Sequence, residues 1–421
     1  MNFSYHIAWG SLVFKQISKY DLKLGMYIHD LNCDWMKHPF MRGSFMLREE
    51  SDLELIQQSP IDQVWIDTMK GLDTAAGAAS EDTAPEPPAP ESTPGQAPAP
   101  AARPLTSHLE ELPTAKRILR EASRAIHSLL TDARLGRQIH LDHLQPVVLR
   151  ITGSILRNPG TLVSLCRLRE ADKGTFQHSV SSCALLILFG HRLTLDETTL
   201  LQLGMAGMLH DLGKMRVPDH ILNKPGKLTD PEYVIMRDHV RLGLETLGQT
   251  PGVSGTVLLV AAEHHERCDG SGYPKHLQGD AISLYGRMAA IVDVYDAVTS
   301  KRIYHHHLEP AVALRRLYER SPRYFDQDLV QQFIQAIGIY PVGSLVRLES
   351  NRLAVVMEQN QGGLLNPKVR VVYDLTRGTA LSPFDLDLSR PEAAGEDIVS
   401  HEEPAAWNLD TDACLNQELR P

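Results

Sequence analysis

The amino-acid sequence predicts a mainly α protein: a helical bundle with a small α+β module before it and a short β-meander after it. Three observations lead to this fold class. Apolar residues recur at three- and four-residue spacing through much of residues 105–340, which is the period of amphipathic helices. An Ala- and Pro-rich stretch precedes this region, and segments of alternating polarity follow it. The chain has 421 residues, of which 43% are hydrophobic, enough for more than one core.

The first predicted unit is a small α+β module over residues 11–73. Short segments rich in β-branched and aromatic residues predict strands, and one amphipathic segment predicts a helix. The strands are expected at Leu12–Ile17, Met26–Leu31 and Gln63–Ile66, and the helix at Glu49–Gln58. Trp35 and Phe40 are either a surface for a protein partner or packing residues. This module shows no pattern that points to catalysis, so we expect it to regulate.

The next segment, residues 74–104, consists mainly of Ala, Pro, Gly, Ser, Thr and acidic residues. Such a composition offers little to bury, and it predicts a disordered linker between two folded units. Beyond the linker, Thr114–Leu130 and His143–Leu156 carry apolar residues at helical spacing. We expect two amphipathic helices that pack on the bundle.

Several apolar helical segments of the bundle carry isolated His or Asp residues. These are His178 in Gln177–Phe189, the pair His210 and Asp211 after the apolar run from Leu200, His239 in Pro231–Leu247, and Asp293 in Arg287–Val298. A carboxylate that enters an apolar interior must be neutralised or coordinated. Imidazole beside carboxylate is a common arrangement for a divalent metal. The pattern therefore predicts a metal site inside the bundle.

Residues 264–274, with the sequence HHERCDGSGYP, add two further histidines to these candidate ligands. This segment begins with His264 and His265 and ends in a loop of Gly and Pro residues, which interrupt helices and strands. The loop residues are Asp269, Gly270, Gly272, Tyr273 and Pro274. Two adjacent histidines cannot both face one core, so a functional loop is favoured over packing.

After Phe333, three alternating segments predict a small β-meander within residues 341–383. They are Ser344–Leu348, Leu353–Glu358 and Lys368–Tyr373. The remaining residues, 384–421, contain ten Asp or Glu residues against Arg390 and Arg420. This segment accounts for most of the formal net charge of −10, and we predict a disordered acidic tail.

Residues 171–337 resemble an HD-GYP domain, a subgroup of the HD metal-dependent phosphohydrolases. The resemblance rests on motifs that occur in the family's order and spacing. They are His178-Ser179, Leu209 to Lys214, Ile221 to Leu228, His239 with Gly243, the loop ending in Gly272-Tyr273-Pro274, Ile291 to Ala297, Arg302 with Tyr304, and Phe325-Asp326. The first module resembles an uncharacterised domain that often precedes bacterial HD-GYP domains.

The resemblance implies two divalent metal ions. The implied ligands are His178, His210, Asp211, His239, His264, His265 and Asp293, with Asp211 bridging both ions. These ligands and a bridging hydroxide would fill about ten of the roughly twelve positions of two octahedral metals, which leaves about two for a phosphodiester. Family members with a third metal use a glutamate four residues before the first histidine, where this chain has Gly174, so a binuclear site is favoured. Nitrogen-rich ligation suits iron or manganese.

The resemblance also implies a substrate, the second messenger cyclic di-GMP, cut to pGpG or onward to GMP. Asp211 and Lys214 are the implied catalytic residues, and Lys214, Tyr273, Arg302 and His305 the implied substrate contacts. His305 departs from the family, which usually has a basic residue there. Two alternatives therefore stay open: a hydrolase of another cyclic dinucleotide, and a cyclic di-GMP sensor without turnover.

Composition excludes some other classes of partner. There is no basic stripe that would neutralise the phosphates of a nucleic-acid polymer. No apolar stretch has the length that crosses a membrane, and the first residues lack the pattern of a signal peptide. The five cysteines are scattered, without a Cys-x-x-Cys pair, as is usual in a reducing compartment. We expect a cytoplasmic protein.

Overall fold

The computed structural model describes residues 14–30, 45–58, 63–67, 72, 106–167, 174–300, 308–360 and 363–416. The chain divides into two compact units, Met1–Ala101 and Ala102–Pro421. One predicted segment and four predicted residues lie outside the described residues: the linker 74–104, the aromatic residues Trp35 and Phe40, and the substrate contacts Arg302 and His305.

The first unit contains a four-stranded antiparallel sheet and one helix. The elements are β1 (Phe14–Ser18), η1 (Lys19–Asp21), β2 (Tyr27–Asp30), β3 (Phe45–Met46), α1 (Glu50–Gln58) and β4 (Gln63–Asp67), and the strand order is β1-β4-β2-β3. Alternate residues of β4, Val64 and Ile66, are fully buried, and they meet Ile56 of α1 in one apolar cluster. The α+β character of the module and its expected strands and helix are thus present.

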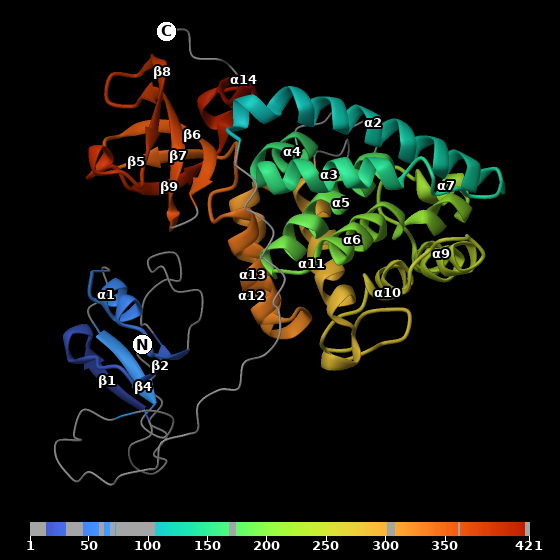
Figure 1. The fold of residues 1–421 in the computed structure, drawn as a ribbon, viewed down its shortest axis with the longest axis horizontal. Helices are drawn as coiled ribbons and strands as arrows, with labels where there is room; N and C mark the ends of the chain where they lie inside the picture. Colours follow the sequence, from blue (N-terminus) through green and yellow to red (C-terminus); the bar gives the residue numbers. More distant parts are fainter. Residues whose placement is uncertain are drawn as a thin grey trace, which may run out of the picture. The chain divides into compact units, whose positions relative to one another are not determined.

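The second unit is mainly a helical bundle. Its helices are α2 (His108–Arg134), α3 (Gln145–Arg157), α4 (Pro159–Arg167), α5 (Gly174–Arg192), α6 (Glu197–Leu209), η4 (Leu212–Arg216), α7 (Asp219–Leu222), α8 (Asp230–Arg237), α9 (His239–Gly248), α10 (Gly255–Glu263), η5 (Gly279–Ala281), α11 (Leu284–Thr299), α12 (Pro310–Tyr324) and α13 (Gln327–Ile337). The prediction of a mainly α fold is confirmed (Figure 1).

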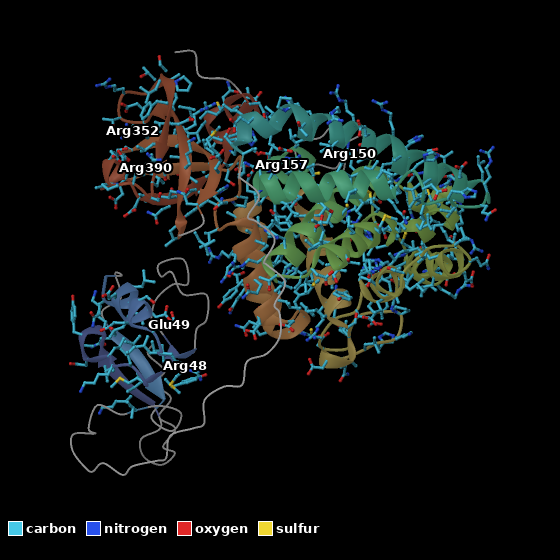
Figure 2. All side chains as sticks on the ribbon, in the orientation of Figure 1. Arg48, Glu49, Arg150, Arg157, Arg352 and Arg390 are labelled. Carbon is cyan, nitrogen blue, oxygen red and sulfur yellow. The ribbon has the colours of Figure 1, made fainter. Side chains whose placement is uncertain are left out.

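The centre of the bundle is α5, because its residues from Val180 to Phe189 are all buried. A helix that is apolar on all sides needs neighbours on all sides. Helices α3, α4, α6, α11 and α13 surround it, and the long helix α2 runs across one side (Figure 1). Arg150 and Arg157 of α3 pair with Glu121 and Glu111 of α2, which fixes the two helices to each other (Figure 2).

The expected helix Pro231–Leu247 is two helices, and this is a correction. Helix α8 ends at Arg237 and α9 begins at His239. The break at Asp238 has a cause in packing: the backbone of η4 comes so close to α9 that a Cβ built on Gly213 would lie 1.9 Å from the carbonyl oxygen of His239. The apolar period continues through the break, so the pattern did not reveal it.

The C-terminal part is a five-stranded antiparallel sheet, larger than the predicted three-stranded meander. Its strands are β5 (Leu345–Leu348), β6 (Arg352–Asn360), β7 (Gly363–Asp374), β8 (Thr379–Asp387) and β9 (Ile398–Glu402), in the order β8-β7-β6-β5-β9. The short helices η6 (Pro391–Ala393), η7 (Pro404–Trp407) and α14 (Thr411–Asn416) complete it. Figure 1 shows this sheet beside the first turns of α2.

The prediction of a disordered acidic tail over 384–421 is wrong for residues 384–416, which are folded. Asp385 accepts two hydrogen bonds from Arg370, a side chain that is only 1% exposed. The Arg370 guanidinium also donates to the carbonyl oxygen of Cys414, and Leu415 is fully buried in the core of the sheet. A buried guanidinium requires a partner, and the acidic segment supplies it. The net charge of this segment suggests a solvated tail, whereas the alternation of its charged and apolar residues is the pattern of a strand.

Candidate metal centre and active site

His210 and Asp211 lie where α6 ends and the short helix η4 begins. Both side chains are buried, with exposed fractions of 3% and 2%. The Oδ2 atom of Asp211 is 2.5 Å from the Nζ atom of Lys214, one turn later in the chain. The Oδ1 atom is buried without a hydrogen-bond partner among the described residues. A buried carboxylate oxygen without a donor is costly, unless a cation binds it.

Two groups of potential metal ligands meet at Asp211. In each group, the ligand atoms lie within 4.8 Å of one another. One group is His178, His210 and Asp211, and the other is Asp211, His239, His264 and His265. The shared carboxylate faces both groups, because its oxygens lie 3.4–3.7 Å from ring nitrogens of His178, His210, His239 and His264.

Three of these histidines are oriented in the same way by backbone carbonyls. The Nδ1 atom of His210 donates to the oxygen of Gly207, that of His239 to Met236, and that of His264 to Val260 and Ala261. Because a carbonyl only accepts, Nδ1 carries the proton and Nε2 presents its lone pair to the centre. Burial lowers the pKa of His210 to about 3, so this ring stays neutral and able to ligate.

His178 is held by two carboxylates of α11. Its Nδ1 atom lies 2.6 Å from Oδ2 of Asp296, and its Nε2 atom lies 3.0 Å from Oδ1 of Asp293. Burial acts to lower the pKa of His178, but the hydrogen bonds to Asp293 and Asp296 outweigh burial and raise the pKa to about 10. The other oxygen of Asp293 is 3.5 Å from Nδ1 of His265. Asp293 therefore touches a histidine from each of the two groups.

The side chains present fit divalent cations. The Nε2 atoms of His178 and His210 are 3.1 Å apart, and those of His239 and His264 are 3.4 Å apart. Where both facing nitrogens carry lone pairs, as in His239 and His264, they repel each other unless a cation lies between or beside them. The orphaned Oδ1 atom of Asp211 faces the same centre. Imidazole and carboxylate groups in this proportion suit a first-row transition metal.

The signature loop folds back on this cluster. Glu266, with an exposed fraction of 1%, accepts hydrogen bonds from the backbone of Lys275 and Leu277 and so closes the loop. The backbone nitrogen of Tyr273 donates to His265, and the two rings stack with centroids 4.6 Å apart. Tyr273 thus lies beside the ligand cluster, as expected for a substrate contact.

The loop residues have distinct structural roles. Gly270 has a φ of 78°, and a Cβ on Gly272 would lie 2.4 Å from the backbone nitrogen of Arg267. The Tyr273-Pro274 peptide bond is cis. Asp269 accepts from the backbone of Ser271 and pairs with Arg323 of α12, so its carboxylate has partners outside the ligand cluster. Asp269 accordingly shapes the loop.

The structure brings together all seven expected ligands and places Lys214 and Tyr273 against them. Sequence reasoning missed the roles of two buried carboxylates, Asp296 behind His178 and Glu266 behind the loop. A signal for Asp296 was its position three residues after Asp293 on one helix face. Glu266 offered no comparable signal, because its partners are backbone groups.

Within the described residues, no helix is both long and apolar enough to cross a membrane.

Comparison with known proteins places the chain in a family. Residues 14–144 match a domain of unknown function, DUF3391, and residues 168–329 match the HD domain. Cyclic di-GMP phosphodiesterase PA4108 of Pseudomonas aeruginosa is 42% identical over 94% of this chain and 94% of its own length. The chain belongs to the HD-GYP family. Because this alignment includes the first module, the shared architecture extends beyond the HD domain.

Two further relatives match parts of this HD-GYP protein. The cyclic di-GMP phosphodiesterase response regulator RpfG of Xanthomonas campestris is 40% identical over 42% of this chain and 48% of its own length. The 3'3'-cGAMP-specific phosphodiesterase 2 of Vibrio cholerae is 42% identical over 31% of this chain and 25% of its own length. The HD-GYP region is thus shared by proteins whose names specify different cyclic dinucleotides.

Proposed function

We propose that this protein is a metal-dependent phosphodiesterase that hydrolyses cyclic di-GMP. The observation that supports the proposal most strongly is the pair of ligand groups sharing buried Asp211. The near full-length similarity to a cyclic di-GMP phosphodiesterase supplies the substrate. The products, pGpG or GMP, follow from the cleavage of one or both phosphodiester bonds.

The proposed cofactor is two divalent metal ions, iron or manganese. His178, His210 and Asp211 would hold one, and Asp211, His239, His264 and His265 the other, with Asp293 beside both groups. Groups of three and four ligands are fewer than the roughly six positions of an octahedral ion, so room would remain for substrate oxygens. When bound, the ions supply activation of a water molecule and neutralisation of phosphodiester charge.

The chain's own residues then bind and orient the substrate. The Lys214 ammonium, which is 22% exposed and next to Asp211, is placed to bind a phosphodiester oxygen as a point charge. The Tyr273 ring offers a stacking surface beside His265. Arg302 is proposed as a further phosphate contact on the strength of the family motif. His305 is proposed as a second one from its position alone, because the family usually has a basic residue there.

A second candidate is the hydrolysis of another cyclic dinucleotide. The observation that favours it is the similarity to a 3'3'-cGAMP-specific phosphodiesterase over the HD-GYP region. A sensor without turnover is disfavoured, because none of the seven ligand positions carries a residue unable to bind metal.

The decisive experiment incubates the metal-loaded protein with cyclic di-GMP, 3',3'-cGAMP and cyclic di-AMP and identifies the products by chromatography. We expect cyclic di-GMP to be consumed fastest, with linear pGpG or GMP as product. An Asp211→Ala variant prepared in parallel controls for contaminating phosphodiesterases. Failure of the wild-type protein to consume cyclic di-GMP would refute the assignment.

A further inference from the structure

Arg237, the last residue of α8, belongs to a column of side chains that starts at the proposed metal centre. The column consists of His265, Tyr273, Arg237 and Tyr233. The His265 and Tyr273 rings are 4.6 Å apart at their centroids. The Cζ atom of Arg237 lies 4.2 Å from the ring centroid of Tyr273 and 5.8 Å from that of Tyr233. Tyr233 is 48% exposed. The column thus leads from a proposed metal ligand to the surface.

The guanidinium of Arg237 has no hydrogen bond or ion pair with any described residue, whereas Lys224 and Arg241 have carboxylate partners. Lys224 pairs with Glu232 of α8, and Arg241 pairs with Asp238 and Glu245. A guanidinium has five N–H donors, and stacking on a ring uses its face while leaving its edge available. Arg237 therefore presents an unused donor edge beside the active site.

Packing does not account for this placement. Helix α8 has no buried residue, so Arg237 is not a by-product of a buried helix face. The helix is instead fixed at its start, where Thr229 and Glu232 form a capping box. The signature loop then fixes the other side of the contact, because Glu266 closes the loop that presents Tyr273.

We propose that Arg237 recognises a guanine base of the substrate by donating to its O6 and N7 atoms, with the Tyr273 and Tyr233 rings as stacking surfaces. This inference rests on the proposed function. Guanine presents two acceptors on that edge, which match two guanidinium donors, whereas adenine presents one acceptor and one donor. The two aromatic rings close to the guanidinium favour a planar base over a phosphate as the occupant. Arg237 is thereby a specificity-determining residue.

The test measures how strongly cyclic di-GMP and cyclic di-AMP inhibit hydrolysis of bis(p-nitrophenyl) phosphate by the metal-loaded, full-length protein. This small diester reports on the metal centre without a base. We expect Arg237→Ala to raise the inhibition constant of cyclic di-GMP about tenfold or more, since a bidentate guanine contact discriminates by at least this factor. The constant for cyclic di-AMP and the rate on the small diester should change by less than about twofold, because neither involves that contact.

Further variants separate the competing explanations. Arg237→Lys should behave like Arg237→Ala, because an ammonium keeps the charge and loses the two-donor edge. Arg241→Ala is the matched control, since this arginine is 57% exposed and already paired with Asp238 and Glu245, and both constants should be unchanged. The proposal fails if both dinucleotides weaken equally and lysine restores both, which identifies a phosphate contact. It also fails if Arg237→Ala changes neither constant.

This test is independent of the assignment of the reaction. If the wild-type protein hydrolyses the small diester and binds cyclic di-GMP without consuming it, the proposed function fails while the Arg237 contact can still be measured. Should Arg237→Ala be unstable, Arg237→Lys provides the same comparison with the stem of the side chain retained.

Discussion

Asp211 has an environment that only a cation explains. Its carboxylate is 2% exposed, four histidine rings face it, and Oδ1 has no donor among the described residues. Burial alone raises the pKa of this carboxyl, but the charge of Lys214, with a further contribution from the neighbouring histidines, holds it well below its usual range. An ionised carboxylate shared by two ligand groups is suited to bridging two metals.

The first prediction is that Asp211→Ala abolishes hydrolysis and reduces both metals together, since one carboxylate serves both groups. Lys214→Ala should keep its metals and lose turnover, because an ammonium binds phosphate and not cations. Elemental analysis and rate measurements on the two purified variants check this. An Asp211→Ala protein with full metal content and a near-normal rate would rule out the binuclear centre.

The second prediction concerns Asp296, which orients His178 without joining the ligand cluster. Asp296→Asn should weaken metal binding by roughly 10- to 100-fold, the usual effect of changing the carboxylate behind a ligating histidine, because the amide has no negative charge. The structural reason is the 2.6 Å contact between Asp296 and Nδ1 of His178. Metal titration measures the change, with Asp280→Asn as a control because that side chain is 98% exposed. Equal affinity in wild type and Asp296→Asn would show that His178 needs no such support.

At this scale the sequence was most informative about the expected metal ligands. The ligands stand at fixed positions in recognisable motifs, and the structure brings all seven together. Glu266 and Asp296 act through hydrogen bonds to other groups of the protein, and such roles depend on the path of the chain in space. That Arg237 has no hydrogen-bonding or ionic partner among the described residues is a property of the fold, and no local sequence pattern predicts it.

At the scale of elements, the contact between η4 and α9 determines whether the two ligand groups meet. Gly213 follows Asp211 by two residues, and a Cβ on it would lie 1.9 Å from the carbonyl oxygen of His239 and 2.4 Å from the nitrogen of Gly243. Any side chain at this position must push α9 away. That movement would separate His239 from Asp211. In the structure, Nε2 of His239 lies 3.4 Å from Oδ1 of Asp211.

The third prediction follows: Gly213→Ala should destabilise the fold by about 3 kcal/mol or more, at the upper end of overpacking effects, and should weaken metal binding. Gly248→Ala, in the same helix α9, is the matched control, because a Cβ there meets nothing within 4 Å. It should be neutral or slightly stabilising, since Ala favours helix over Gly. Thermal unfolding and metal content of both variants are the measurements. Similar behaviour of the two variants would show that η4 can move without cost.

The three- and four-residue spacing of apolar residues predicted most helices well, because an amphipathic helix buries one face in any arrangement. It failed at Asp238, where the break depends on the close approach of another segment. The sequence prediction also failed from Phe384 onward, where Asp385 and Asp387 alternate with Phe384 and Leu386 in a strand. There, net charge suggested a solvated tail, whereas the partner of Asp385 is a buried arginine 15 residues earlier in the chain.

At the scale of the whole molecule, the start of α2 connects the bundle to the C-terminal sheet. The backbone nitrogen of His108 donates to Glu358 of β6, and its ring contacts the hydroxyl of Thr161 of α4. The ring is 1% exposed, and burial, with a smaller contribution from the charges of Arg370 and Lys116, lowers its pKa to about 4. The neutral form is therefore the one that fits this junction.

The fourth prediction is a loss of stability in acid that depends on His108. Above pH 6.5 the ring is neutral in both states and has no effect. As the pH falls from 6.5 towards 4, His108 binds a proton in the unfolded chain but not in the folded state. The free energy of unfolding therefore decreases by about 3 kcal/mol by pH 4. In His108→Gln this component should be absent, so the unfolding free energies of the two proteins should converge as the pH falls. A constant difference between pH 7 and pH 4 would show that His108 titrates normally when folded.

The last prediction is that a truncated chain beginning at Thr106 folds and keeps its activity. The proposed ligands all lie beyond this residue. The boundary between the two compact units lies between Ala101 and Ala102. Thr106 itself belongs to the bundle: its nitrogen donates to the carbonyl of Arg157, and its carbonyl accepts from Asn158. Ser107 then caps α2 through a capping box with Glu110, so the new terminus would begin at a well-defined helix start. We expect metal content and turnover of cyclic di-GMP to stay within about twofold of the full-length values, and the bundle to keep its melting temperature, as for a domain with its own core. If the truncated chain is soluble and metal-loaded yet inactive, the first module contributes to catalysis and is more than a regulator.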